Sequence, residues 1–141
     1  MSQIKDVMSQ PTATLTTQDN VYEAAVLMKQ YNVGFIPVLE QDRVVGLLTD
    51  RDIVVRGIAE KKPNSSRIRH VMTEQLITIS PDQSIDEAAD LMAEHQIRRL
   101  LVVDNGKLVG IVSLGDLAVR TPLMDEASHA LSEISESPYT H

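Results

Sequence analysis

The sequence predicts a mixed α+β (α/β) fold built from two β-α-β-β-α repeats that pack with pseudo-twofold symmetry. When the sequence is aligned with itself at a shift of 64 residues, residues 4–56 match residues 68–120 without a gap. Ile4 then lies over Ile68 and Arg56 over Arg120. Apolar, glycine and acidic positions coincide under this shift. Because two copies are too few for an open solenoid, we expect a closed pair with clefts between the copies.

Each repeat shows the same order of predicted elements. Apolar residues at helical spacing follow a capping box, Asn20 with Glu23 in the first copy and Ser84 with Glu87 in the second. Asn105-Gly106 is typical of a two-residue hairpin turn. The first copy is expected to have a turn at 4–8, strands at 12–15, 35–39 and 44–48, and helices beginning near 21 and 49. The second is expected to have a turn at 68–72, strands at 76–79, 100–103 and 107–112, and helices beginning near 85 and 113.

The repeat also sets the predicted domain boundaries. We expect a first domain at 1–59, a charged linker at 60–67 that contains Pro63, and a second domain at 68–121. In the remaining tail, 122–141, the spacing of Met124, Ala127, Leu131 and Ile134 predicts a short amphipathic helix.

Composition argues against several classes of partner. A formal net charge of −7 disfavours a nucleic-acid partner, whose phosphates attract clustered lysine and arginine. The sequence has no apolar stretch near the roughly 20 residues that span a bilayer. It contains no cysteine, which fits a reducing compartment. We therefore expect a cytoplasmic protein that binds neither membranes nor nucleic acid.

The most informative local feature is the junction at which the last strand of each repeat meets its second helix. A hydroxyl residue is followed three positions later by an acid, Thr49 with Asp52 and Ser113 with Asp116. One interpretation is an ordinary helix capping box. The other is an anion site, since free N–H groups and the helix dipole attract phosphate there while the carboxylate accepts from sugar hydroxyls.

Three stretches carry a family resemblance over residues 4 to about 120: Val33 to Val38, Thr49-Asp50-Arg51-Asp52-Ile53, and Ile97 to Asp104. With the tandem repeat, the chain resembles a CBS-domain pair, also called a Bateman module. The resemblance implies that ligands carrying adenosine bind in the clefts between the two domains. The acid of each junction would then hold the ribose, and hydroxyl and basic groups would hold phosphates.

The resemblance also implies which residues form the two clefts. The Asp52 cleft would contain Leu47, Thr49, Arg51 and Asp52 together with Ile77, Ile97 and Arg98. The Asp116 cleft would contain Ile111, Ser113 and Asp116 together with Ala13, Val33 and Gly34, and Arg99 would lie where the phosphate ends meet. The two copies differ, since Leu114-Gly115 replaces Asp50-Arg51, so equal sites are not expected.

Nothing in the sequence indicates catalysis. The four histidines occur singly, without the paired spacing of a metal site, and no nucleophile motif or phosphate-loop lysine is present. We therefore expect no catalytic residues, no metal and no catalytic cofactor. The predicted function is that of a non-enzymatic sensor whose regulatory ligand is AMP, ADP, ATP, NAD or S-adenosylmethionine, acting on a protein partner that the sequence does not identify. The alternative is a ligand-free structural module for dimerisation or protein interaction.

A homodimer is expected in either case. CBS pairs commonly associate, and helices that carry small residues can approach a second copy closely. The sequence offers Ala24-Ala25 and Ala88-Ala89 for such a contact.

Overall fold

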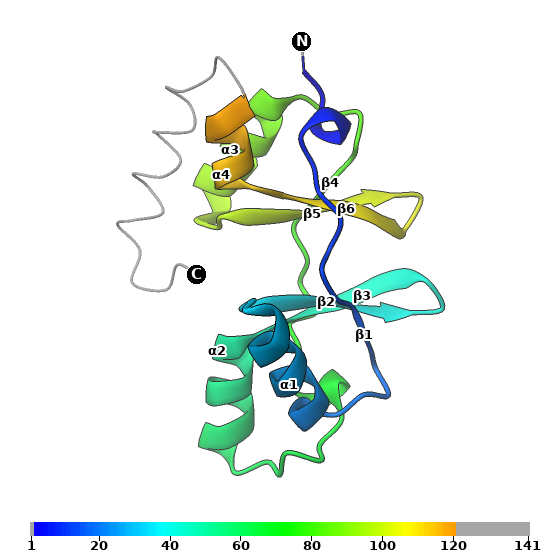
Figure 1. Cartoon of the computed structure of the whole chain (residues 1–141), viewed down its shortest axis with the longest axis vertical. Coiled ribbons are helices and arrows are strands. Elements are labelled where there is room, and N and C mark those ends of the chain that lie inside the picture. Colours follow the sequence, from blue (N-terminus) through cyan, green and yellow to red (C-terminus); the bar gives the residue numbers. More distant parts are fainter. Residues whose placement is uncertain (1, 121–141) are drawn as a thin grey trace. The chain divides into compact units, whose positions relative to one another are not determined.

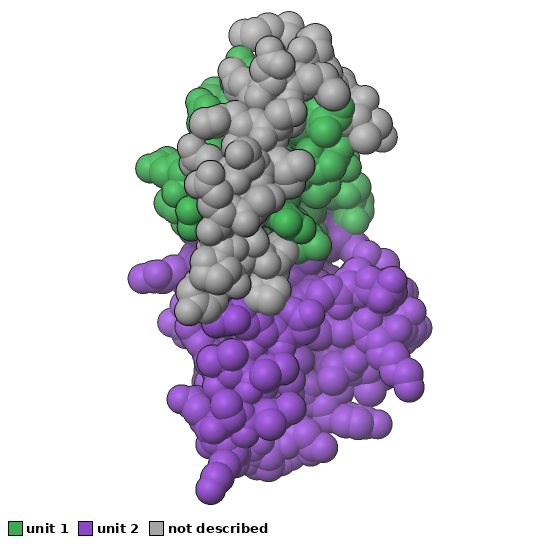
Figure 2. All heavy atoms as spheres, turned by 90° about the vertical axis from the view of Figure 1, so that its left-hand side faces the viewer, with its two compact units in different colours: residues 1–10, 77–141 green, residues 11–76 purple. Residues whose placement is uncertain are grey.

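The computed structural model describes residues 2–120, so the predicted tail helix lies outside the described residues. The chain forms two compact units, which Figure 2 colours separately. Unit 1 contains Met1–Gln10 together with Ile77–His141, and unit 2 contains Pro11–Leu76. The units therefore do not follow the sequence repeat, because the first ten residues belong with the second copy.

Unit 2 contains three strands, one long helix, a second helical segment made of three elements, and a short 3₁₀ turn. Figure 1 shows how the labelled strands and helices are arranged. Its elements are β1 (Leu15–Thr16), α1 (Val21–Tyr31), β2 (Phe35–Glu40), β3 (Arg43–Thr49), α2 (Asp50–Asp52), η2 (Ile53–Gly57), η3 (Ile58–Glu60) and η4 (Ile68–His70). The elements α2, η2 and η3 form one helical segment that passes from α-helical to π-helical and then 3₁₀ geometry. Both α1 and this segment lie on the same side of the strands (Figure 1).

Unit 1 repeats the same order of elements around the second copy. Its elements are η1 (Ile4–Asp6), β4 (Thr78–Ile79), α3 (Ile85–His95), β5 (Arg99–Asp104), β6 (Lys107–Ser113) and α4 (Leu114–Arg120). The predicted α+β class and the tandem order of elements are confirmed. The first strand of each copy is shorter than predicted, with two residues.

Strand pairing is the same in both units. The short first strand runs parallel to the second, and the second and third form an antiparallel hairpin. The predicted turn at Asn105-Gly106 is present, with positive φ at both residues. Its counterpart uses Gln41 and Asp42, also at positive φ, which no glycine marks in the sequence. Each hairpin carries a register shift one residue before its glycine, Gly46 or Gly110.

The long helices begin and end as their sequences predict. Asn20 accepts a hydrogen bond from the Glu23 N–H at 2.8 Å, and Ser84 accepts one from the Glu87 N–H at 3.2 Å. The pKa of the Glu87 carboxyl lies below its ordinary value, first because the Gln83 side chain donates to it and then because the Ser84 backbone does. Each helix ends at a residue in the left-handed conformation, Asn32 or Gln96.

Each unit buries its own hydrophobic core. Each core is formed mainly by one copy of the repeat and includes the short opening turn of the other copy. Ile4 and Val7 are buried in the core of unit 1, whereas Ile68 and Val71 are buried in that of unit 2. Backbone hydrogen bonds fix both segments: the Ile4 N–H donates to Gln83 at 2.9 Å, and the Ile68 N–H donates to Asp19 at 2.9 Å. The apolar turn that opens one copy thus completes the core of the other.

Three of the four alanines assigned to a dimer surface are buried. Ala24 and Ala88 are fully buried and Ala89 is 4% exposed, because they lie on the faces of α1 and α3 that pack into the cores, whereas Ala25 is exposed. Among the residues whose side chains the structure describes, the larger apolar ones that remain exposed lie in unit 2: Tyr22, Val26, Tyr31, Val54, Val55 and Ile58.

A search of the described residues finds no helix with the length and apolar character needed to cross a membrane.

Candidate functional site

The junction between β3 and α2 in unit 2 is a complete capping box. The hydroxyl of Thr49 accepts from the Asp52 N–H at 3.0 Å, and the Asp52 carboxylate accepts from the Thr49 N–H at 3.1 Å. The two residues therefore hold each other at the point where extended backbone becomes helical. The local sequence predicted this capping box. The box fixes the position of the Asp52 carboxylate in the absence of a ligand.

A third residue, which the sequence analysis did not single out, also holds Asp52. The Thr73 hydroxyl lies 3.1 Å from both carboxylate oxygens of Asp52. Its backbone is placed by a pair of hydrogen bonds with Leu47 on β3, at 2.8 and 2.9 Å. A signal for Thr73 was present, because the repeat places it over Ser9, another hydroxyl residue.

The Asp52 carboxylate still has hydrogen-bonding capacity. One oxygen, Oδ2, accepts from the Thr49 N–H and faces the Thr73 hydroxyl, whereas Oδ1 has only the shared contact with that hydroxyl among the bonds found in the described chain. An ionised carboxylate offers about four acceptor sites. Asp52 is 8% exposed, so the residue is not completely enclosed. This geometry fits the binding of sugar hydroxyls.

Unit 1 repeats the junction with weaker support. Asp116 accepts from the Ser113 N–H at 2.8 Å, and the Ser113 hydroxyl accepts from the Asp116 N–H at 3.1 Å. Asp116 is half-buried rather than buried. Ser9 pairs with Ile111 through the backbone, as Thr73 does with Leu47, yet no bond from its hydroxyl to Asp116 is found among the described residues.

Other predicted site residues lie at the junction of their own unit. The Gly34 carbonyl accepts from the Asp50 N–H at 2.9 Å, and the Arg98 carbonyl accepts from the Leu114 N–H at 2.8 Å. Arg99 pairs with Ser113 in the β5–β6 register. The side chains of Arg51, Arg98 and Arg99 are exposed.

The apolar site residues are less exposed. Ala13 and Val33 pack against the core of unit 2, and Ile77 and Ile97 pack against that of unit 1. Leu47 is half-buried and Ile111 is buried. The sequence grouped each junction with residues of the opposite unit, and that grouping stays a prediction.

A glycine on each third strand gives room to a methionine. The position that a Cβ on Gly46 would occupy lies 2.5 Å from the Met72 sulfur, and the equivalent position on Gly110 lies 2.6 Å from the Met8 sulfur. The backbone pairs between Leu47 and Thr73, and between Ile111 and Ser9, hold these methionines over the strands. The close approach explains why a glycine stands next to each junction.

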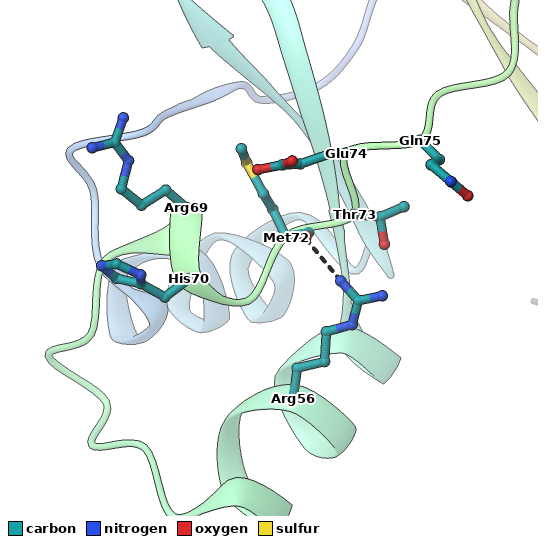
Figure 3. Close-up of a pocket in the computed structure, with 7 residues that line it drawn as sticks. All are labelled: Arg56, Arg69, His70, Met72, Thr73, Glu74 and Gln75. Atoms are coloured by element: carbon teal, nitrogen blue, oxygen red, sulfur yellow. Dashed lines mark hydrogen bonds between the residues drawn. The ribbon is translucent and has the colours of Figure 1, made fainter.

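A pocket of about 370 Å³ lies beside the unit 2 junction. Seven residues line it: Arg56, Arg69, His70, Met72, Thr73, Glu74 and Gln75. Arg56 rises from the helical segment and donates to the Met72 carbonyl at 3.0 Å, whereas Arg69 and His70 belong to η4 (Figure 3). The sequence analysis missed Arg56, although the repeat aligns it with Arg120.

No group of three or more histidine, aspartate or glutamate side chains within residues 2–120 is placed to hold a metal ion.

Three known proteins illustrate what this chain resembles. The uncharacterized protein YlbB of Bacillus subtilis is 52% identical over 138 residues, which cover 96% of this chain and 93% of the relative. Hypoxic response protein 1 of Mycobacterium tuberculosis is 32% identical over 86% of this chain and 87% of its own length. A crystal structure of Hypoxic Response Protein I with two coordinated zinc ions superposes on the present chain with a TM-score of 0.78. The match covers 86% of the present chain and 100% of the chain in that crystal structure.

The third is the CBS domain pair of protein MJ0100, solved in complex with 5′-methylthioadenosine and S-adenosyl-L-methionine. It superposes with a TM-score of 0.72 at 29% identity and covers 84% of this chain and 98% of that one. The family model of the CBS domain matches this sequence twice, at residues 4–57 and 68–120. Both matches end within the helical segments that follow Asp52 and Asp116, so the duplicated junction is part of the shared fold, and the chain belongs to the CBS domain family.

Proposed function

We propose that this protein is a regulatory sensor which binds an adenine nucleotide or a related adenosyl compound at its strand-to-helix junctions. The observation that carries the proposal is the oriented carboxylate of Asp52, which Thr49 and Thr73 hold and which keeps free acceptor capacity. Two hydroxyls of a ribose are suitable donors for it. The MJ0100 complex supports the class of ligand, since a related CBS pair binds two adenosyl compounds.

The proposed sensor acts on something other than its ligand. At the described junctions, the hydroxyl and carboxylate groups serve to cap the helices and to orient Asp52, which is a binding arrangement. Ligand binding would therefore change how the protein contacts a second copy or a regulated protein partner. A ligand shifts such an equilibrium only by its differential affinity for the two states.

The surface of unit 2 supports a second candidate, a structural interaction module that needs no ligand. Six large apolar side chains are exposed on α1 and on the helical segment that begins at Asp50, and Ile58 is 69% exposed. In unit 1, the repeat places Asp86, Asp90 and His95 over Tyr22, Val26 and Tyr31. On the two long helices, α1 and α3, the apolar surface is thus particular to α1, as expected for a specific contact.

The first prediction separates these two candidates by calorimetry. We expect at least one of AMP, ADP, ATP, NAD and S-adenosylmethionine to bind the protein and to raise its melting temperature. A ligand at a hundredfold excess over its dissociation constant stabilises the native state by about 2.7 kcal/mol. If all five ligands give no heat at millimolar concentration and no thermal shift, the structural module is the better description.

The second prediction concerns self-association. We expect a homodimer in solution, and we expect Ile58→Asp to shift it toward monomer because a charge would be buried in an apolar contact. Light scattering at tens of micromolar protein measures the mass. Gln41→Asp, which adds the same charge on the β2–β3 turn, is the matched control. A wild-type monomer with and without nucleotide would contradict the prediction.

A further inference from the structure

We propose that the pocket beside Asp52 binds phosphate groups and that Arg56 is its principal contact. The proposal deepens the proposed function and rests on it where the phosphate belongs to a nucleotide. It adds a site that the sequence analysis did not assign. All seven lining residues belong to unit 2, so the site is complete within one unit.

The pocket adjoins the proposed ribose site through a single side chain. Thr73 lines the pocket, and its hydroxyl lies 3.1 Å from the Asp52 carboxylate. A nucleotide whose ribose met Asp52 would therefore have this pocket as its neighbour. Of the residues around it, Arg56 follows Asp52 by about one helical turn and faces Met72 and Thr73 (Figure 3).

One hydrogen bond orients the Arg56 side chain and leaves most of its N–H donors for a ligand. One of its terminal nitrogens donates to the Met72 carbonyl at 3.0 Å, while the side chain remains exposed. A guanidinium has five N–H donors in a rigid fork that matches phosphate oxygens. Because the Met72 carbonyl already orders the side chain, binding a phosphate would cost little further side-chain entropy.

Two arginines lie around the pocket. Arg69 on η4 adds its charge to that of Arg56, His70 adds ring nitrogens that can hydrogen-bond, and the nearby carboxylates are Glu74 on the lining and Asp52 behind Thr73. Arg69 points away from Arg56 in Figure 3, so it marks the rim of the pocket rather than its centre. We therefore assign Arg56 the direct contact and Arg69 a weaker, longer-range attraction.

The equivalent positions in unit 1 lack this charge balance. The repeat places Lys5 over Arg69 and Asp6 over His70. Lys5 lies 3.4 Å from Asp82 in an ion pair, and Asp6 accepts from the Gln3 N–H at 2.9 Å. One cation is thus paired and one histidine is replaced by an acid, so unit 1 does not reproduce the Arg69–His70 rim, whereas the repeat keeps an arginine, Arg120, over Arg56.

The test compares three variants, each of which replaces one cation by glutamine. Arg56→Gln removes the charge but keeps an amide donor for the Met72 carbonyl. Arg69→Gln removes the rim charge, and Lys61→Gln removes an exposed cation that does not line the pocket. Adenosine, AMP and ATP are titrated into each by calorimetry. We expect Arg56→Gln to weaken AMP and ATP by about tenfold or more, since hydrogen bonds between charged groups are strong.

We expect adenosine affinity in Arg56→Gln, and all affinities in Lys61→Gln, to stay close to those of the wild type. Equal loss of adenosine and AMP in Arg56→Gln would overturn the proposal, because it would show a structural role at Met72. Unchanged affinities for all three ligands in Arg56→Gln would overturn it as well.

A titration with inorganic phosphate shows whether the pocket binds the phosphate of a nucleotide or a free phosphate ion. It also tests the phosphate pocket separately from the proposed binding of adenosyl compounds. The probe is inorganic phosphate alone, and its binding is detected through changes in the amide NMR signals of residues 73–75. If phosphate binds the wild type, competes with AMP and is lost in Arg56→Gln, the pocket holds the nucleotide's phosphate end. If phosphate binds in the same way while no adenosyl compound binds, the pocket takes a free phosphoanion and only the proposed function fails. No binding of phosphate or nucleotide overturns both.

Discussion

Replacing Gly46 by alanine is expected to lower the free energy of unfolding by about 1–3 kcal/mol, the usual cost of overpacking a core. The new methyl group would lie 2.5 Å from the sulfur of Met72 and within 3.2 Å of the two carbons next to it. Met72 cannot simply swing away, because it is 7% exposed and its neighbour Thr73 is fixed to Leu47 by two backbone hydrogen bonds. Urea unfolding followed by circular dichroism measures the change.

Gly57→Ala is the matched control. Gly57 is also buried in unit 2, but a Cβ there would meet only a Val71 methyl at 3.9 Å, an ordinary contact. Because alanine favours helical backbone over glycine, this substitution should be neutral or stabilising by up to about 1 kcal/mol. Equal destabilisation by both alanines would mean that strain at Met72 is not the cause.

A double variant tests the contact itself. Met72→Ala alone should cost about 2–5 kcal/mol, because it removes a buried side chain. Combined with Gly46→Ala, it should cost less than the sum of the two changes, since the added methyl then enters space that the methionine has left. Additive costs would contradict the contact as the source of strain.

The repeat predicted most of the fold because it fixes which residues are apolar and where helices are capped. It did not predict that residues 1–10 complete the second copy. The physical reason is that the opening turns of the copies are nearly interchangeable: Ile4, Val7 and Met8 lie over Ile68, Val71 and Met72. By apolar pattern, either turn could fill either core, and specific contacts such as the backbone bond of Ile4 with Gln83 and the ion pair of Lys5 with Asp82 distinguish the two arrangements.

The candidate site was predictable where its parts are close in sequence. Thr49 and Asp52 are three residues apart, so a capping box and an oriented carboxylate follow from local rules. Thr73 was missed because it reaches the site from a distant segment that pairs with β3. Arg56 is only four residues from Asp52, but it was missed because its position depends on the same segment, through the Met72 carbonyl. The contacts of Thr73 and Arg56 depend on the pairing of the segment around Thr73 with β3, which is distant in sequence.

The junctions should differ most clearly in their response to losing the acid. We expect Asp52→Asn to weaken adenosine and AMP by about 10- to 100-fold, the range that corresponds to one or two hydrogen bonds to a charged group. Asp116→Asn should have a smaller effect. Asp52 is buried and oriented by both Thr49 and Thr73, whereas Asp116 is half-buried and held through Ser113. Where unit 2 has Arg51, moreover, unit 1 has Gly115, so the start of α4 carries no arginine at the matching position.

Asparagine is the informative substitution because its oxygen can still accept from the Thr49 N–H, so the cap survives while the charge and the second oxygen are lost. Thr73→Val provides the companion variant, since it removes the hydroxyl that orients Asp52 and leaves the carboxylate in place. If the carboxylate binds the ribose, Thr73→Val should weaken adenosine less than Asp52→Asn does, although both variants lose a buried hydrogen bond. The reverse order in calorimetry would show that Asp52 serves only the helix cap, and stronger loss in Asp116→Asn would assign the tighter site to unit 1.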